Sequence, residues 1–334
     1  MFSIYKTVLP YISLNKIQKI NIEILKKKIA SKKYKLIRTI CPICNNHKEY
    51  ETISKVDRFG IEVKNVICKK CGLIRNLKCL DSSSLKSFYN NEYRLIYTGK
   101  KSTNQKHLKN IFYAQFETGK KYYELINKII NIKKKNTVLE IGCSCGGVLS
   151  YFKDKGLKVT GLDYDNTYLK YGKKKKLNLI YGSLENLNKK KFDIIILSHV
   201  FEHIYEIKSF INNLNNFLAY DGIIFIAVPG IYNKNYYSIR HIKYNYKKIL
   251  FLYYLQNAHI YSFSKKTLTN FFRFTVDNFR ILYIDETINC IVSARNFKRN
   301  TKKKIKNDYK TFKFFYFINY IKYNLIKTIK GIYD

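Results

Sequence analysis

The chain has 334 residues, of which 46% are hydrophobic and 16% aromatic, a composition too apolar for an intrinsically disordered protein. It is long enough to bury a full α/β core and to carry one or two smaller appendages. Since no run of about 18 or more apolar residues interrupts the lysines, the sequence predicts no membrane span.

The formal net charge of +40 raises the question of a polyanionic partner, because clustered Lys and Arg neutralise phosphates. The lysines are scattered along the whole chain, however, with abundant Asn, Ile and Tyr and no Trp. AT-rich codons would produce that bias without selection for a ligand. We therefore favour compositional drift over a dedicated nucleic-acid surface, and a nucleic-acid partner stays the less favoured alternative.

Residues 1–40 are expected to hold one basic helix. Apolar side chains recur at helical spacing among the lysines, namely Ile17, Ile20, Ile24 and Leu25. Such a helix either packs on the body of the protein, which we favour, or lies on an anionic membrane surface as a peripheral contact. The first 16 residues lack the order of a secretory signal, so we expect a retained N-terminus and a cytoplasmic protein.

Two C-x-x-C pairs, separated by 23 residues, fall within residues 41–80. Four thiolates converging as a tetrahedron suit a structural zinc ion, which leaves no open position for catalysis. We expect a small zinc-ribbon-like module that binds Zn²⁺ through Cys41, Cys44, Cys68 and Cys71. Unmetallated thiols are the alternative, and disulfides are disfavoured in a reducing compartment.

Residues 81–136 read as a helical linker and lead-in. They contain the aromatic run Ser87-Phe88-Tyr89-Asn90-Asn91-Glu92-Tyr93. These aromatic side chains either pack two domains together or contact a substrate, and both interpretations are open.

Residues 137–298 alternate between strand-like and helical patterns. The apolar strands VLEIG, LKVTGLD, LNLIYG, FDIIILSHV and GIIFIAVPG follow one another with helices between them, which predicts a doubly wound, mostly parallel α/β fold. One of the helices carries a broad apolar stripe that we assign to the core: Ile207, Phe210, Ile211, Leu214, Phe217 and Leu218. Residues 299–334 form a basic, aromatic C-terminal tail without a recognisable motif.

The first of these strands leads into a turn of small residues, Gly142-Cys143-Ser144-Cys145-Gly146, that opens a helix. Such a turn lets the backbone approach a ligand closely and directs helix N–H groups at it. Asp163 follows Gly142 by 21 residues and ends the next strand, where a carboxylate can accept both hydroxyls of a ribose. NAD-binding folds share this geometry, so the loop alone does not identify the ligand.

Glu140 stands two residues before the first glycine, and GLDYD, YGSLEN, FDIIILSHVFEHI and GIIFIAVP follow in order. In these motifs the stretch from Thr137 to Pro229 resembles the class I S-adenosylmethionine-dependent methyltransferases, although the family usually has Gly where Ser144 stands. The resemblance implies a Rossmann-like, seven-stranded sheet and S-adenosyl-L-methionine as the cofactor. It also implies the cofactor-binding residues: Glu140, Gly142, Ser144 and Gly146 on the methionine and ribose side, Asp163 at the ribose, Ser183 and Leu184 beside the adenine, and Ser198 facing the transferable methyl.

The cysteine module and the aromatic run together resemble bacterial methyltransferases with an N-terminal zinc-binding domain, among them sugar C-methyltransferases. This resemblance implies a small-molecule methyl acceptor, such as a sugar or nucleotide-sugar intermediate of surface polysaccharide synthesis. Two alternatives stay open: an RNA methyltransferase with a zinc ribbon, and a zinc-ribbon binding module on an inactive methyltransferase scaffold. The acceptor atom and the oligomeric state are not indicated.

His199, His203 and His259 are the candidates for a general base, which methyl transfer needs only if the acceptor must lose a proton. We favour His199, after a strand, and His259, in the segment HIYSFS, because both should face the carboxyl ends of the strands. For Glu202 and His203 we expect packing and capping. Each histidine is also open to a purely structural role.

Overall fold

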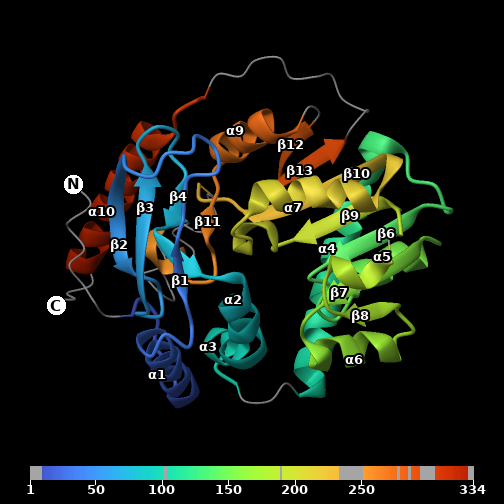
Figure 1. The fold of residues 1–334 in the computed structure, drawn as a ribbon, viewed down its shortest axis with the longest axis horizontal. Helices are drawn as coiled ribbons and strands as arrows, with labels where there is room; N and C mark the ends of the chain where they lie inside the picture. Colours follow the sequence, from blue (N-terminus) through green and yellow to red (C-terminus); the bar gives the residue numbers. More distant parts are fainter. Residues whose placement is uncertain are drawn as a thin grey trace.

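The computed structural model describes residues 10–100, 104–188, 190–232, 251–276, 279–284, 287–293 and 305–329. A seven-stranded sheet and a four-stranded sheet lie at opposite sides of the view in Figure 1, and the helices α2 (Ser82–Phe88) and α3 (Arg94–Thr98) lie between them.

The seven-stranded sheet has the order β12-β13-β10-β9-β6-β7-β8. Its parallel strands are β6 (Thr137–Ile141), β7 (Lys158–Asp163), β8 (Leu179–Tyr181), β9 (Phe192–Ser198) and β10 (Leu218–Pro229). The antiparallel strands β12 (Phe279–Ile284) and β13 (Thr287–Ser293) complete one edge. The predicted Rossmann-like, mostly parallel sheet is therefore confirmed.

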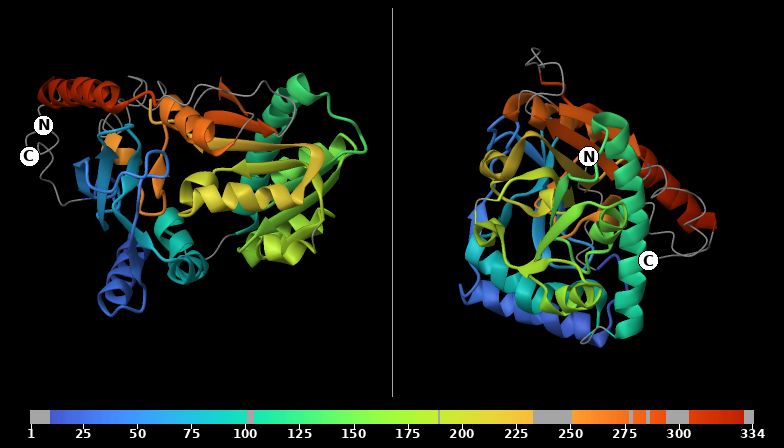
Figure 2. Two further views of the ribbon diagram at one scale, coloured as in Figure 1. Left: turned by 45° about the horizontal axis from the view of Figure 1, so that its top comes forward. Right: turned by 90° about the vertical axis from the view of Figure 1, so that its right-hand side faces the viewer.

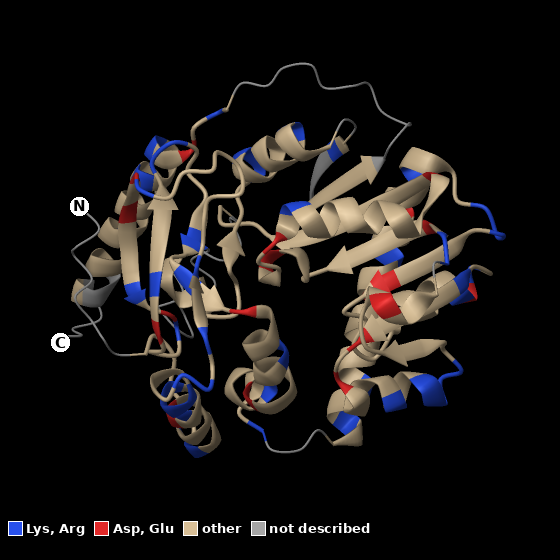
Figure 3. Ribbon diagram, in the orientation of Figure 1, with Lys and Arg blue, Asp and Glu red and all other residues tan. Residues whose placement is uncertain are grey.

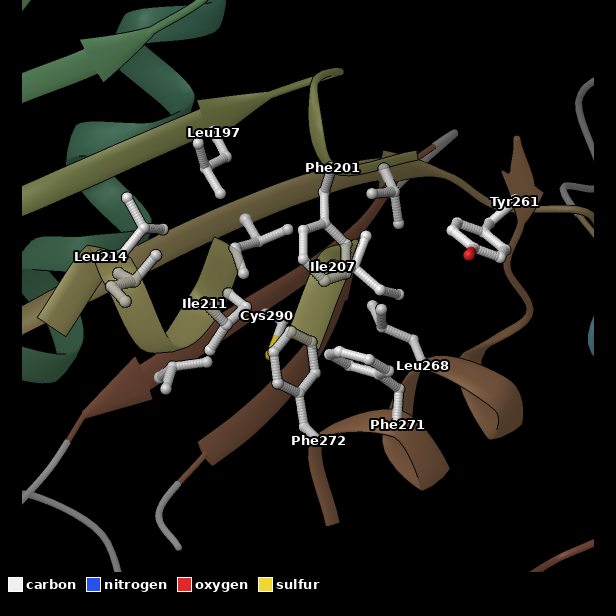
Figure 4. Close-up of a cluster of buried hydrophobic side chains, with 14 of the residues drawn as sticks. Leu197, Phe201, Ile207, Ile211, Leu214, Tyr261, Leu268, Phe271, Phe272 and Cys290 are labelled. Carbon is white, nitrogen blue, oxygen red and sulfur yellow. The ribbon is translucent and has the colours of Figure 1, made fainter. Parts of the chain in front are cut away.

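Helices cover both faces of this sheet, because alternate residues of each strand point to opposite sides. On one face Val138 and Ile194 pack with α4 (Gln105–Ile130), α5 (Gly147–Asp154) and α6 (Asn166–Lys174). On the other, their neighbours Leu139 and Ile195 belong to the cluster formed with α7 (Ile207–Leu214) and α9 (Lys265–Thr275). In Figure 4 the rings of this second cluster meet beside Ile207.

The apolar stripe predicted for a single helix is distributed over three elements. Ile207, Ile211 and Leu214 are buried on α7, as expected. A short 3₁₀ turn, Asn215–Phe217, ends the helical course, and Leu218 already begins β10. The prediction that Phe217 and Leu218 continue the same helix is wrong, although Leu218 is buried and Phe217 packs against the core.

The four-stranded sheet has the order β11-β4-β3-β2 and is antiparallel throughout. Its strands are β2 (Tyr50–Val56), β3 (Glu62–Cys68), β4 (Ile74–Asn76) and β11 (Tyr261–Ser262), and the pair β1 (Leu36–Arg38) and β5 (Lys78–Leu80) lies apart from it. Tyr261 pairs with Arg75, so the sheet takes its fourth strand from outside residues 41–80. The cysteine module and the methyltransferase-like region are thus joined through a shared sheet.

The C-terminal region, for which the sequence suggests only a basic tail, contains the long helix α10 (Tyr309–Ile329). Phe312 and Tyr316 are buried in one cluster with Ile53 and Ile67 of the four-stranded sheet. Figure 2 shows α10 along the outer side of that sheet. An opposite stripe is exposed to solvent: Phe314, Phe317, Ile321 and Leu325.

The helix predicted within residues 1–40 is α1 (Lys16–Ala30), which begins at an Asn15 capping box. It packs on the body of the protein, since the Gln18 side-chain amide donates to the Ile96 carbonyl at 2.8 Å. Its buried apolar residues are Ile22 and Leu25, whereas Ile20 and Ile24 are 47% and 38% exposed. The face of α1 that packs on the protein therefore coincides only in part with the apolar positions noted in the sequence.

Within the described residues, no helix is both long and apolar enough to cross a membrane. Figure 3 shows Lys and Arg on elements of both halves of the molecule. This distribution agrees with the scattered lysines of the sequence.

Candidate functional site

The loop between β6 and α5 has the strained backbone that its small residues suggest. Gly142, Ser144 and Gly146 have φ angles of 73°, 52° and 74°, in the left-handed region that favours glycine. A Cβ atom added at Gly142 would lie 2.5 Å from Val200 Cγ2. The loop therefore requires glycine at this position, while Ser144 adopts an uncommon conformation for its residue type.

Asp163 holds this loop from the end of β7. One carboxylate oxygen accepts the Ser144 backbone N–H at 2.7 Å, and the other accepts the Asp165 N–H at 2.8 Å. Each oxygen has a further lone pair for a ligand. Desolvation raises the pKa of Asp163 above its ordinary value, against the opposing effect of these two N–H donors.

Glu140 is the most unusual residue of the site. It is 1% exposed, and its Oε2 atom has no hydrogen-bond partner among the described residues. Burial raises its pKa well above the ordinary value, with a smaller contribution from the nearby Asp163. Since an unpartnered buried carboxyl oxygen is costly, this geometry suits a ligand that brings a hydroxyl or ammonium donor.

The other sequence-predicted cofactor residues follow neighbouring strands. Ser183 precedes the 3₁₀ turn Leu184–Leu187 after β8, and Leu184 is buried. Ser198 ends β9, with its hydroxyl 3.0 Å from that of Tyr122. Because β6, β7, β8 and β9 are parallel, all eight predicted residues lie at one edge of the sheet, where ligands of such folds bind.

Three histidines and one carboxylate gather after β9. His199 has a φ of 53° and a side chain 47% exposed, and its Nδ1 is 3.6 Å from Glu202 Oε1. The His203 and His259 rings meet edge to face, with centroids 4.7 Å apart. Burial lowers the pKa of His259 to about 3 and also lowers that of His203. Burial of Glu202 opposes ionisation, yet the neighbouring histidines hold its pKa at about 2.

The structure thus places Glu202 and His203 at the centre of this group, whereas the sequence made His203 a less favoured candidate base and offered packing and capping for the pair. The missed signal is the Glu-His dipeptide three residues after His199, on the turn that follows a parallel strand. Their spatial partner His259 lies far along the chain, so the cluster itself could not be read from spacing.

The aromatic run of the linker covers this edge of the sheet. It forms a π-helical turn, Tyr89–Tyr93, between α2 and α3. The Tyr89 hydroxyl is 2.8 Å from His203 Nδ1, and Arg94 Nε is 3.3 Å from Asp165 Oδ2. Phe88, 1% exposed, packs the interior, while Tyr89 and Tyr93 are only half-buried and stand beside the histidines. The linker therefore contacts the ends of both β9 and β7.

The four predicted zinc ligands converge in the second candidate site. The sulfurs of Cys41 and Cys71 are 3.4 Å apart, those of Cys44 and Cys68 are 3.5 Å apart, and all four lie within 4.8 Å of one another. A zinc ion with Zn–S bonds of about 2.3 Å would separate its sulfurs by roughly 3.8 Å, so the cluster fits a tetrahedral ion. The Asn46 amide, 3.3 Å from Cys68 Sγ, adds the donor that a thiolate ligand accepts.

The fold and the loop define a Rossmann-like α/β protein with a ligand site at the carboxyl edge of its sheet. Residues 113–275 match the family described as a methyltransferase domain. This part of the chain is a class I S-adenosylmethionine-dependent methyltransferase domain, as the motifs predict.

Two curated relatives illustrate the similarity. The chain is 36% identical over 111 residues to a ubiquinone biosynthesis O-methyltransferase of Pelagibacter ubique. The aligned stretch covers 31% of this chain and 46% of that protein. The chain is 32% identical over 114 residues to a probable (S)-tetrahydroprotoberberine N-methyltransferase of Papaver bracteatum, covering 31% of this chain and 32% of the relative. The chain thus spans less than half the length of either relative.

Among solved structures, similarity extends to a plantazolicin methyltransferase in complex with a substrate analogue and SAH. The TM-score is 0.46 and the identity 12%, covering 64% of this chain and 97% of that one. A SAM-dependent methyltransferase from Archaeoglobus fulgidus has a TM-score of 0.42 and 16% identity, covering 57% of this chain and all of the other.

Proposed function

We propose that the protein transfers a methyl group from S-adenosylmethionine to a small molecule. The observation that carries this proposal is the unpartnered carboxyl oxygen of Glu140 beside the left-handed Gly142 loop, within a methyltransferase domain. The cofactor would bring an ammonium group and ribose hydroxyls to the carboxylates of Glu140 and Asp163. Ser144, Gly146, Ser183, Leu184 and Ser198 complete the proposed cofactor site.

Methyl transfer from a sulfonium is an in-line displacement, so holding the acceptor at near-attack distance supplies much of the acceleration. In this chain the half-buried rings of Tyr89 and Tyr93 are positioned to orient an acceptor over the sheet edge. His199, exposed and close to Glu202, is the better placed of the two proposed bases. His259 packs edge to face against His203, and burial lowers its pKa to about 3, which makes it a weak base.

The sugar or nucleotide-sugar acceptor and the surface-polysaccharide context are a narrower proposal, supported by the cysteine module and the aromatic linker. The matched relatives carry names of small-molecule methyltransferases, which supports a small molecule as the methyl acceptor.

We also propose that Cys41, Cys44, Cys68 and Cys71 bind structural zinc. Their free thiols suit a reducing compartment such as the cytoplasm.

The test uses full-length protein and S-adenosylmethionine with a labelled methyl group. One reaction contains a mixture of nucleotide-sugars and small-molecule cell extract, and a parallel one contains total RNA. Label in the small-molecule fraction that disappears with Asp163→Ala supports the proposal. Label in RNA supports the RNA methyltransferase instead, and cofactor binding without transfer to either would favour an inactive scaffold.

A further inference from the structure

Glu202 is a buried carboxylate whose oxygens lack a hydrogen-bond donor among the described residues. It lies in the 3₁₀ turn Phe201–His203 after β9, with its side chain 2% exposed. Two histidine nitrogens lie close to Oε1, His199 Nδ1 at 3.6 Å and His203 Nε2 at 3.8 Å, but both are beyond hydrogen-bond distance. A cation between these groups would offset the free-energy cost of burying the Glu202 carboxylate without hydrogen bonds.

The orientation of His203 identifies which of its nitrogens can bind such a cation. Its Nδ1 lies 2.9 Å from the Ala258 carbonyl oxygen, which can only accept, and 2.8 Å from the Tyr89 hydroxyl, which can also accept, so a proton on Nδ1 is compatible with both partners. In that neutral tautomer Nε2 holds the free lone pair, and Nε2 is the atom that faces Glu202 Oε1. A histidine whose other N–H donates to a backbone carbonyl is the usual arrangement at protein metal sites.

His259 completes the group from a different part of the chain. One ligand atom each of Glu202, His203 and His259 lies within 4.8 Å of the others. His259 is held in place two residues before the pairing of Tyr261 with Arg75. Ligand atoms around an ion at about 2.0 to 2.2 Å are separated by roughly 3.0 to 3.6 Å, so a small contraction would suffice. The His203 side chain retains 14% exposure, so this group is not fully closed to solvent.

We propose that Glu202, His203 and His259 bind a divalent transition-metal ion, in a site separate from the cysteine cluster. A proton on His203 Nε2 would meet Glu202 only at 3.8 Å, whereas a metal ion satisfies all three side chains together. Two neutral imidazoles and one carboxylate suit zinc, iron(II) or manganese(II). They leave coordination positions open and a net charge of +1.

Given the proposed methyl transfer, such a centre favours an anionic oxygen of the acceptor, because a bound metal lowers the pKa of a coordinated hydroxyl. The Tyr89 hydroxyl lies 2.8 Å from His203 Nδ1, on the side of the ring away from the proposed metal, where it helps to hold the imidazole in place. Metal binding does not depend on methyl transfer, so it can be tested by measuring binding alone.

The experiment uses the full chain with its cysteine site filled by zinc. Elemental analysis counts metals per chain as purified, and Mn²⁺ is then titrated while the free ion is followed by electron paramagnetic resonance. Mn²⁺ suits the probe because thiolates select softer ions. The variants are Glu202→Gln and His259→Gln, and the controls on α4 are His107→Gln and Glu117→Gln. Circular dichroism and retained cysteine-bound zinc show that each variant is folded.

We expect one metal equivalent beyond the cysteine-bound zinc, either present on purification or supplied as Mn²⁺. Its affinity should fall about tenfold or more in Glu202→Gln and in His259→Gln, but not in the controls. The proposal is overturned if the wild type holds no second metal in either measurement. It is equally overturned if folded Glu202→Gln and His259→Gln bind the ion as tightly as the wild type. Loss of methyl transfer with metal binding intact would count against the proposed function alone.

Discussion

At the scale of single residues, the Asp163 carboxylate supports the loop and offers acceptors to a ligand. It accepts the Ser144 and Asp165 N–H groups, and each oxygen retains a lone pair for the ribose. Asp163→Ala should weaken S-adenosylmethionine binding by about 1 to 3 kcal/mol, because cofactor hydroxyls lose their acceptors in a buried site. Asp163→Asn, which keeps one acceptor oxygen, should lose less. Calorimetry giving equal affinities for wild type and Asp163→Ala would remove this residue from the cofactor site.

Glu140 gives a pH-dependent prediction in the absence of cofactor. Its folded-state pKa is raised well above the unfolded value of about 4.3, so above that pH the unfolded state releases a proton that the folded state keeps. The free energy of unfolding should therefore fall as pH rises above about 4.3, until the folded-state pKa is passed. Glu140→Gln cannot titrate and should lack this contribution.

Urea unfolding of both proteins at a series of pH values measures that difference. Glu140→Gln should gain stability relative to the wild type as pH increases, while its affinity for S-adenosylmethionine decreases. If the free energy of unfolding changes with pH in the same way in both proteins, the Glu140 carboxyl is hydrated in the folded state, contrary to its exposure of only 1%.

The conformation of the loop from Gly142 to Gly146 could be predicted because its constraint is local. A turn that opens a helix needs small residues, and Gly142 and Gly146 do adopt positive φ angles. The companions of Glu202 could not be predicted, because His259 reaches it through the pairing of β11 with β4. Likewise, nothing in the sequence indicates that Asp163 also supports the Ser144 backbone.

At the scale of elements, α10 should stabilise the four-stranded sheet. Phe312 is fully buried against that sheet, whereas Phe314 on the same helix is 69% exposed. Phe312→Ala should lower the free energy of unfolding by about 3 to 5 kcal/mol, since it leaves a cavity in a packed cluster. Phe314→Ala is the matched control and should change it by less than about 0.5 kcal/mol. Similar effects of the two substitutions on denaturant unfolding would contradict the packing of α10.

The elements that could be predicted are those with a local sequence pattern. Continuous apolar runs that alternate with helical segments indicate β6, β7 and β9. β11 has only two residues, and its identity as a strand depends on a partner near residue 75. α10 combines an apolar stripe against the sheet with exposed Phe314 and Phe317, so its amphipathic pattern is blurred.

At the scale of the whole molecule, the cysteine cluster connects to more than its own module. Cys41, Cys68 and Cys71 belong to the same buried cluster as Leu139 and Ile195 of the large sheet. The strand β11 follows the parallel strands of the large sheet in the sequence but pairs with β4 in the four-stranded sheet. We therefore expect damage at the cysteines to spread along β11 and to α10, and to be limited at the parallel strands, whose second face packs in a separate buried cluster.

Loss of one thiolate tests this expectation together with the zinc assignment. Cys68→Ser should lose the single zinc of the cysteine cluster, and the module, too small for a large core of its own, should unfold locally. Hydrogen exchange should then quicken in residues 41–80 and at Tyr261, while β6, β7 and β9 stay protected. Cys79→Ala removes a buried thiol outside the cluster and should keep both the zinc and the protection. A metal-free wild type with a protected module would refute zinc, whereas lost protection in the parallel strands would show that the two regions fold as one cooperative unit.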